Sequence, residues 1–264
     1  MKSITRPLTI DNEGDTVNES QQTQADQRTK IVAVIGALAE EVDLIARSLE
    51  DVRRFHQSGL DVVDGLIPLP TAGQGEEQGR IRLVATVAGM GLVNAAATTQ
   101  FLIDYGRPEA IIFSGIAGNL TPDLHINDVV LGKTVRYLDS DMKLISESYP
   151  ALEEFHSDPR LLDLASQVLD RRGIRYIQGV IASGNRFVEG DQKVEDVKVQ
   201  TGANAAEMEG AAVLHIAAKN DIPALIIRAL SDNADTEYET FKEFDISAYA
   251  DTAAQIVVEL VRKL

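Results

Sequence analysis

From residue 31 onward, short apolar runs alternate with stretches that have the spacing of amphipathic helices. The runs are rich in β-branched residues and almost continuously apolar, which is typical of strands covered on both faces. They lie at 31–35, 81–89, 110–118, 128–137, 176–184 and 223–232. Helical spacing follows at 40–50, 92–106, 159–173, 207–220 and 247–264. This alternation predicts an α/β fold, a single three-layer domain with a mixed, mainly parallel twisted sheet flanked by helices.

The first 30 residues have a different composition. They are polar and rich in Gln, Asp, Glu, Asn and Thr, with few residues that could form a core. Such a stretch buries too little apolar surface to offset its ordering entropy. We therefore expect residues 1–30 to be a disordered N-terminal extension, with a plain tail favoured over a regulatory or partner-binding role. Residues 31–264 contain no linker-like stretch and are expected to form one catalytic domain.

Charge and residue content exclude several classes of function. The chain has 25 Lys and Arg against 41 Asp and Glu, a net charge of −16, so it would repel nucleic-acid phosphates. It has no cysteine, and its four histidines are widely separated, so we expect no metal site. No apolar run reaches about 18 residues, and the N-terminus lacks the apolar core of a signal peptide. We expect a cytoplasmic protein with no membrane partner.

Candidate site residues follow the strands, because ligands of open α/β sheets bind outside the carboxyl ends of the strands. The first segment is GALAEEV (36–42), in which Glu40 and Glu41 begin a helix. Carboxylates there suit the positive end of the helix dipole, and the pattern alone favours this structural role over catalysis. The second segment, AGMGLVNA (88–95), is a glycine turn before a helix. It is a weak sign of a dinucleotide site, and a plain tight turn explains it equally well.

Three further segments end strands or begin helices. In FSGIAGNL (113–120), the small Ala117 and Gly118 would let a ligand lie against the backbone, although a simple turn also fits. In AEMEGAA (206–212), two carboxylates bracket a methionine at the mouth of an apolar helix, where burial is costly unless the carboxylate binds something. Hydroxyl binding and helix capping both remain open for Glu209. In RALSD (228–232), an arginine inside an apolar strand must be paired, and an acid follows, which a structural ion pair would also explain.

Three acids thus lie at separate strand or helix ends, namely Glu41, Glu209 and Asp232. This is an arrangement that acid–base chemistry requires. The five segments, in this order, resemble the methylthioadenosine/S-adenosylhomocysteine nucleosidases of the purine nucleoside phosphorylase-like superfamily, over about residues 30–264. The most specific pieces are 36–42, 206–212 and 228–232. The resemblance implies hydrolysis of the N-glycosidic bond of 5′-thio-substituted adenosines to adenine and a thioribose. It also implies that the enzyme is a homodimer that needs no cofactor and binds only a small-molecule nucleoside.

The resemblance also assigns roles. Glu41 would activate the attacking water, Asp232 would protonate purine N7, and Glu209 would hold the ribose hydroxyls. Adenine leaves poorly as an anion, so Asp232 must be protonated near neutral pH while Glu41 stays ionised. The other expected substrate-binding residues are the stacking aromatic Phe187, the purine-edge Val188, the sugar neighbour Met208, Ser231 beside the acid, the hydrophobic wall Phe241, and Glu207, Ala117, Gly118 and Arg228.

Two alternatives are a phosphate-dependent nucleoside phosphorylase and a catalytically silent nucleoside-binding or storage protein. Related phosphorylases bind phosphate with arginines where this chain has Glu41 and Phe113, and a carboxylate would repel the dianion. A storage protein would not need an acid and a base together. The chain departs from the family pattern at Ile116, where a serine is usual, at Asn185, where an aspartate is usual, and at Leu138, where a histidine is common. Arg228 retains the other polar contact near the water, so we expect hydrolysis to survive.

Overall fold

The computed structural model describes residues 29–70, 79–232 and 247–264. The predicted N-terminal extension therefore lies almost wholly outside the described residues. The six predicted strands are all present, as β1 (Ile31–Gly36), β4 (Arg80–Val87), β5 (Ala110–Asn119), β6 (Val129–Tyr137), β8 (Tyr176–Ser183) and β10 (Ala224–Asp232). Four further strands join them in one mixed sheet, namely β2 (Glu50–Gln57), β3 (Leu60–Pro68), β7 (Phe155–His156) and β9 (Ala205–Glu207).

Part of the sheet closes on itself. The strand order is β10-β6-β8-β9-β5-β1-β4-β3-β2, and β10 also pairs with β5. The five strands from β10 to β5 therefore form a ring, from which β1, β4, β3 and β2 extend as an open sheet. Parallel pairing joins β4 to β1, β1 to β5 and β5 to β10, which brings the carboxyl ends of these strands to one edge. The short β9 lies between β5 and β8, antiparallel to the first and parallel to the second.

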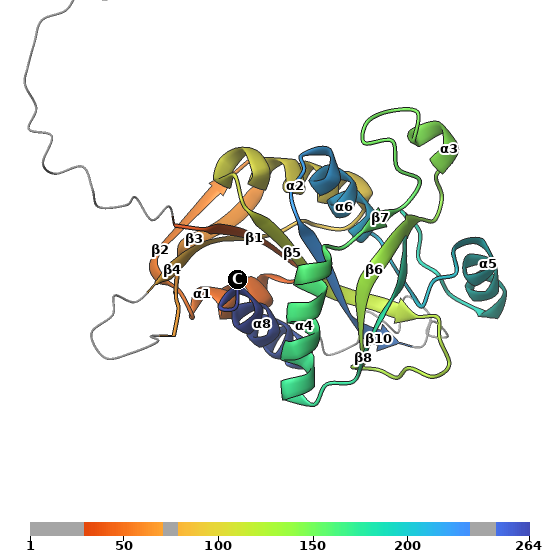
Figure 1. Cartoon of the computed structure of the whole chain (residues 1–264). Helices are drawn as coiled ribbons and strands as arrows, with labels where there is room; N and C mark the ends of the chain where they lie inside the picture. The colour runs from red at the N-terminus through yellow and green to blue at the C-terminus, as the bar shows by residue number, and fades with distance from the viewer. Residues whose placement is uncertain (1–28, 71–78, 233–246) are drawn as a thin grey trace, which may run out of the picture.

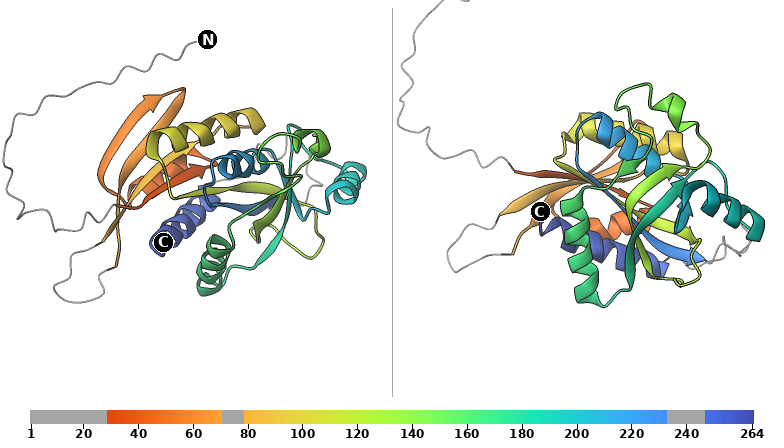
Figure 2. Two further views of the ribbon diagram at one scale, coloured as in Figure 1. Left: turned by 45° about the horizontal axis from the view of Figure 1, so that its top comes forward. Right: turned by 45° about the vertical axis from the view of Figure 1, so that its right-hand side comes forward.

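Helices cover both faces of the sheet, so the three-layer prediction is confirmed (Figure 1). On one face lie α2 (Leu92–Gly106) and α6 (Gly210–Lys219), which pack against each other. On the other lie α1 (Ala39–Ala46), α4 (Pro159–Arg172) and α8 (Ser247–Val261), with α8 packed on both α1 and α4. Figure 2 shows the same layers from two further directions. The short α3 (Met142–Ile145) and α5 (Asp191–Thr201) lie at the periphery.

The apolar runs of the sequence supply the core. Val34 and Ile112 of the central strands pack toward the α1–α4–α8 layer, in a cluster that includes Leu162 and Val257. Their strand neighbours face the other way, into a cluster with Leu102 of α2 and further residues of α6. Strands buried on both faces thus explain the continuous apolar pattern. Each buried aliphatic side chain contributes about 1.5–3 kcal/mol, and this core holds the site-bearing strand ends in place.

Three predicted helix boundaries were wrong. The helix expected over 40–50 ends at Ala46, and residue 50 already begins β2. Strand β2 has the sequence EDVRRFHQ and is almost entirely exposed, so it lacks the apolar pattern that would have indicated a strand. The helix expected over 207–220 begins only at Gly210, because Glu207 ends β9. The last predicted helix ends at Val261.

Candidate active site

A cavity of about 450 Å³ lies where the strands end. Gly36 ends β1, Glu207 ends β9, and Ser231 lies one residue before the end of β10, while the loops after β4 and β8 complete the wall. The residues that line the cavity are Gly36, Ala37, Leu38, Ala88, Gly89, Met90, Phe113, Gly115, Ile116, Ala117, Gly118, Asn185, Arg186, Phe187, Val188, Ala206, Glu207, Met208, Glu209, Arg228 and Ser231. The volume is in the range of small-molecule sites. All five segments singled out in the sequence contribute to this wall.

Glu41 lies just beneath the wall formed by residues 36–38 and is fully buried. Its Oε2 accepts a hydrogen bond from the Ala37 N–H at 3.0 Å, whereas Oε1 has no hydrogen-bond partner among the described residues. Burial raises the pKa of Glu41 to about 7, although the Ala37 N–H, the Ser114 hydroxyl and the charge of Arg228 oppose the shift. A carboxyl group with a pKa near neutrality can exchange a proton at physiological pH.

Two hydroxyl groups, those of Ser114 and Tyr249, lie close enough to Glu41 to interact with it. The Tyr249 hydroxyl of α8 donates to the Gly115 carbonyl oxygen at 2.5 Å and lies 3.4 Å from Ser114 Oγ. Burial, and then the charge of Glu41, raise the pKa of Tyr249. Ser114 and Tyr249 also line a second cavity of about 240 Å³ under α8. Tyr249 thereby ties α8 to the strand that carries Gly115.

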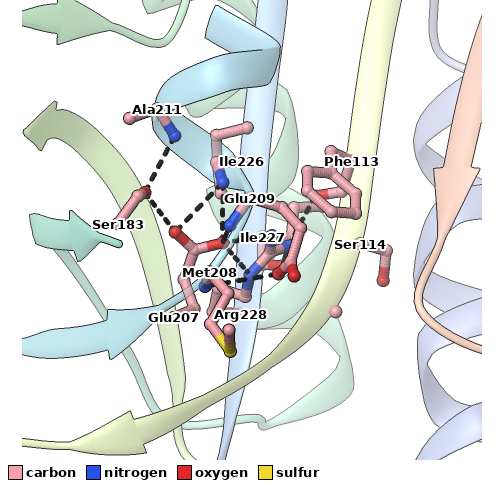
Figure 3. A network of polar contacts seen from close by, with 12 residues as sticks. Phe113, Ser114, Ser183, Glu207, Met208, Glu209, Ala211, Ile226, Ile227 and Arg228 are labelled. Carbon is pink, nitrogen blue, oxygen red and sulfur yellow. Dashed lines mark hydrogen bonds and ion pairs between the residues drawn. The ribbon is translucent and has the colours of Figure 1, made fainter. Parts of the chain in front are cut away.

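A buried ion pair joins the end of β9 to the middle of β10. Arg228 Nη2 lies 2.7 Å from Glu207 Oε2, and both side chains are almost fully buried. The Arg228 guanidinium also lies over the Phe113 ring, 3.9 Å from its centroid. Figure 3 shows the Glu207 carboxylate between Ser183 and Arg228. A Cβ atom at Gly115 would lie 2.9 Å from Arg228 Nη1, so this arrangement requires a residue without a side chain at position 115.

Glu207, rather than Glu209, caps α6. Both Glu207 oxygens accept hydrogen bonds from the Gly210 N–H, and Oε2 also accepts from the Glu209 N–H at 3.1 Å. The Glu209 side chain makes no cap and instead accepts from the Gly91 N–H at 2.7 Å. Burial and the neighbouring charge of Glu207 raise the pKa of Glu209. Of the two roles left open by the sequence, helix capping is thus excluded for Glu209.

The loop after β8 is fixed to the start of α2. The Asn185 side chain accepts a hydrogen bond from the Leu92 N–H at 2.9 Å, next to the Gly91 N–H that Glu209 holds. Gly91 has φ +96°, a conformation that L side chains rarely adopt. Beyond Asn185, Phe187 and Val188 lie on the cavity wall. A wall with an aromatic side chain and two carboxylates can take a flat base and a hydroxylated sugar.

Comparison with known proteins identifies the family. The family model described as "Phosphorylase superfamily" matches residues 31–262. The chain belongs to the phosphorylase superfamily. It is 29% identical over 239 residues to a 5′-methylthioadenosine/S-adenosylhomocysteine nucleosidase of Actinobacillus succinogenes, covering 88% of this chain and 99% of that protein. The predicted resemblance is thereby confirmed.

Solved structures of superfamily members agree. The 5′-methylthioadenosine/S-adenosylhomocysteine nucleosidase of Neisseria meningitidis, in complex with methylthio-immucillin-A, is 32% identical, with a TM-score of 0.77, 89% of this chain covered and 100% of the other. The futalosine hydrolase of Helicobacter pylori is 26% identical, with a TM-score of 0.77, 89% of this chain covered and 99% of the other. This member of the superfamily is therefore an enzyme, a hydrolase of nucleosides.

The structure gathers most of the predicted site residues at one cavity. Those on its wall are Glu209, Phe187, Val188, Met208, Glu207, Ser231, Ala117, Gly118 and Arg228. Glu41 lies directly behind the wall. Asp232 ends β10 with its backbone opposite Gly118, but the placement of its side chain lies outside what the structure describes. Phe241 falls in 233–246 and is also outside the described residues. At three positions the sequence departs from the usual family pattern. Of these, Ile116 and Asn185 line the cavity, whereas Leu138 is buried in a small core cluster.

Sequence reasoning missed Ser114 and Tyr249. Tyr249 lies on the apolar face of α8, more than 200 residues from Glu41 in the sequence, so no local pattern connects the two. The only available signal was a tyrosine among alanines on a buried helix face, since a buried phenol needs a partner.

In the described ranges, no helix is long and apolar enough to cross a membrane. No three His, Asp or Glu side chains of these ranges are grouped as metal ligands.

Proposed function

We propose that this enzyme hydrolyses the N-glycosidic bond of 5′-thio-substituted adenosines, methylthioadenosine and S-adenosylhomocysteine, to adenine and a 5-thioribose. The names of the relatives at 29% and 32% identity support this substrate class. The observation that carries the proposal is Glu41, a fully buried carboxyl group with a pKa near 7 and one oxygen that has no partner in the described structure. A buried carboxylate behind a nucleoside-sized cavity suits the activation of one water molecule.

The proposed reaction moves two protons. Asp232 donates one to purine N7, so that the electron pair of the breaking bond between ribose C1′ and N9 leaves with a neutral adenine. Glu41 accepts the other from water, whose oxygen forms the new bond to C1′. The transition state resembles an oxocarbenium ion, which nearby carboxylates stabilise. Each proton transfer contributes about 10²- to 10⁴-fold to the rate.

The remaining wall residues hold the substrate. We assign the ribose hydroxyls to Glu209, whose carboxylate faces the cavity and is already anchored by the Gly91 N–H. Phe187 would stack on the base, and Met208 would lie beside the sugar. We assign Glu207 to positioning, because its oxygens are engaged by Arg228, Ser183 and the start of α6. Arg228 would then lie near the attacking water as a positive charge fixed in place by Glu207.

A phosphorylase reaction is disfavoured by the same geometry. Arg228 is the buried arginine of this wall, and Glu207 already neutralises it. When ionised, Glu41 would also oppose a phosphate dianion at this end of the cavity.

The test replaces Glu41 by its neutral isostere. In Glu41→Gln, we expect kcat for methylthioadenosine to fall by about 10²- to 10⁴-fold, since the base is lost, while the dissociation constant for the nucleoside changes little. Adenine release measures the first quantity, and calorimetric titration measures the second. Glu40→Gln is the matched control, because Glu40 is the adjacent exposed carboxylate of the same helix. Near-normal turnover in Glu41→Gln would contradict the assigned role.

The acid is tested in the same assay. Asp232→Asn should lose most turnover while nucleoside binding persists, since asparagine cannot supply the proton to N7. A variant that still releases adenine at the normal rate would refute the role of Asp232 as the acid.

A further inference from the structure

The start of α2 is held by two side chains from other parts of the chain. The residue before this helix is Gly91, which has no side chain to accept from the first N–H groups of the helix. Glu209, immediately before α6, accepts from the Gly91 N–H at 2.7 Å. Asn185, in the loop after β8, accepts from the Leu92 N–H at 2.9 Å. Two successive N–H groups therefore join α2 to α6 and to the loop after β8.

Asn185 is fixed on both sides. Its backbone N–H donates to Oδ2 of Asp139, in the loop after β6, at 3.2 Å. Its side-chain oxygen approaches α2 so closely that a Cβ atom at Gly91 would lie 3.1 Å from it. The base-binding wall, formed by Phe187 and Val188, follows shortly after in the sequence and lines the cavity. The side-chain contact with α2 therefore sets the position of this wall relative to the helix.

We propose that Asn185 is a positioning residue, which fixes the base-binding wall to the same point of α2 that anchors Glu209. The helix is a firm reference, because Leu102 is buried in the core and α2 packs against α6. One bond joins the base and the sugar of a nucleoside, so the two parts of the site must keep a fixed separation for both to bind at once. This inference rests on the proposed function, which assigns the base to Phe187 and the ribose hydroxyls to Glu209.

The experiment measures the binding of adenine, because adenine tests the base-binding wall without the sugar. Asn185→Ala removes the contact with Leu92 but keeps the backbone contact with Asp139. We expect the dissociation constant of adenine to rise by about two- to tenfold, the range of one hydrogen bond. The KM for methylthioadenosine should rise by a similar factor, while kcat stays within about twofold of the wild-type value. A merely structural defect would instead lower kcat with the fraction of folded protein and leave the dissociation constant unchanged.

Two further variants separate the contact from the substitution. Asn185→Asp keeps an oxygen that can accept from the Leu92 N–H, so its affinity for adenine should be close to that of the wild type. Asn220→Ala is the matched control, because Asn220 also joins another element to α2, through Gln100, and neither residue belongs to the described wall of the cavity. Hydrogen exchange of the Leu92 amide, followed by NMR, reports on the contact itself. It should be faster in Asn185→Ala and slow again in Asn185→Asp.

Equal affinity of the wild type and Asn185→Ala for adenine would overturn the proposal, even if the Leu92 amide exchanged faster, because the contact would then be only structural. A loss of the same size in Asn220→Ala would also overturn it, as would a failure of Asn185→Asp to restore binding. If the wild-type protein bound no adenine, the proposed function would fail as well. The two failures are therefore distinguishable.

Discussion

At the residue scale, Glu41 is the group whose environment matters most. Its burial favours the neutral acid, whereas the Ala37 N–H, the Ser114 hydroxyl and Arg228 favour the carboxylate, and the balance leaves the pKa at about 7. Since a general base must be ionised, we expect kcat/KM to fall as the pH is lowered through about 7. A profile that stays flat down to pH 5 would contradict this account.

Removing the Ser114 hydroxyl should shift the pH at which kcat/KM falls on the acidic side of the pH–rate profile, its low-pH limb. Ser114→Ala deletes a group that stabilises ionised Glu41, so the pKa of Glu41 should rise and the low-pH limb of kcat/KM should shift to higher pH. A hydrogen bond of about 0.5–1.5 kcal/mol corresponds to a shift of about one pH unit or less. The pH–rate profile measures the shift, with Ser166→Ala of α4 as the control. An unchanged or lowered apparent pKa would rule out the assigned effect.

The raised pKa of Glu41 in the wild-type protein also makes the free energy of unfolding depend on pH. Glu41 has a folded-state pKa of about 7 against 4.5 for the free side chain, so ionisation is penalised only in the folded state. Below about pH 4.5 this penalty is absent, and it grows as the pH rises through the folded-state pKa, to about 3 kcal/mol. Glu41→Gln should therefore raise the free energy of unfolding at pH 8 relative to the wild type, and by less at pH 5. Urea unfolding at the two pH values measures both, and an equal effect at both would contradict the linkage.

At the element scale, the junction of β9, β10 and α6 holds the site together. Glu207 ends β9, caps α6 at Gly210 and pairs with Arg228 of β10. Glu207→Gln should leave a buried guanidinium without its counter-charge and lower the free energy of unfolding by about 3–5 kcal/mol. Urea unfolding measures this, with Glu195→Gln on the exposed face of α5 as the control. A loss no larger than that of the control would show that the pair is not structural.

The element scale also shows how far sequence reasoning reaches. The central strands were predicted because burial on both faces leaves a continuous apolar run, as in β1 and β10. The edge strand β2 was missed because its exposed, charged residues carry no such pattern, and its position is set by pairing with β3. Glu41 and Glu209 were found because they lie at element ends. Tyr249 could not be found, because only the packing of α8 on the sheet brings it to Ser114 and Gly115.

At the scale of the whole molecule, the homodimer stays a prediction with a defined surface to test. Val93, near the start of α2, is 78% exposed. Met90, which lies shortly before it in the sequence, is also exposed and lines the cavity. If a second copy covers the start of α2, Val93→Asp should yield monomers in sedimentation velocity, because a buried unpaired charge is costly. Val199→Asp on α5, where the side chain is also 78% exposed, should leave the assembly unchanged. A Val93→Asp protein with the wild-type mass would remove this surface from the interface.

The central claim is that water, and not phosphate, receives the ribosyl group, in a site where carboxyl groups act as the general acid and the general base. The most direct measurement is adenine release from methylthioadenosine by the wild-type protein, with and without inorganic phosphate, together with the mass of the sugar product. We predict the same rate of adenine release in both conditions and free 5-methylthioribose as the product. A strict requirement for phosphate, with the 1-phosphate ester as the product, would contradict the account.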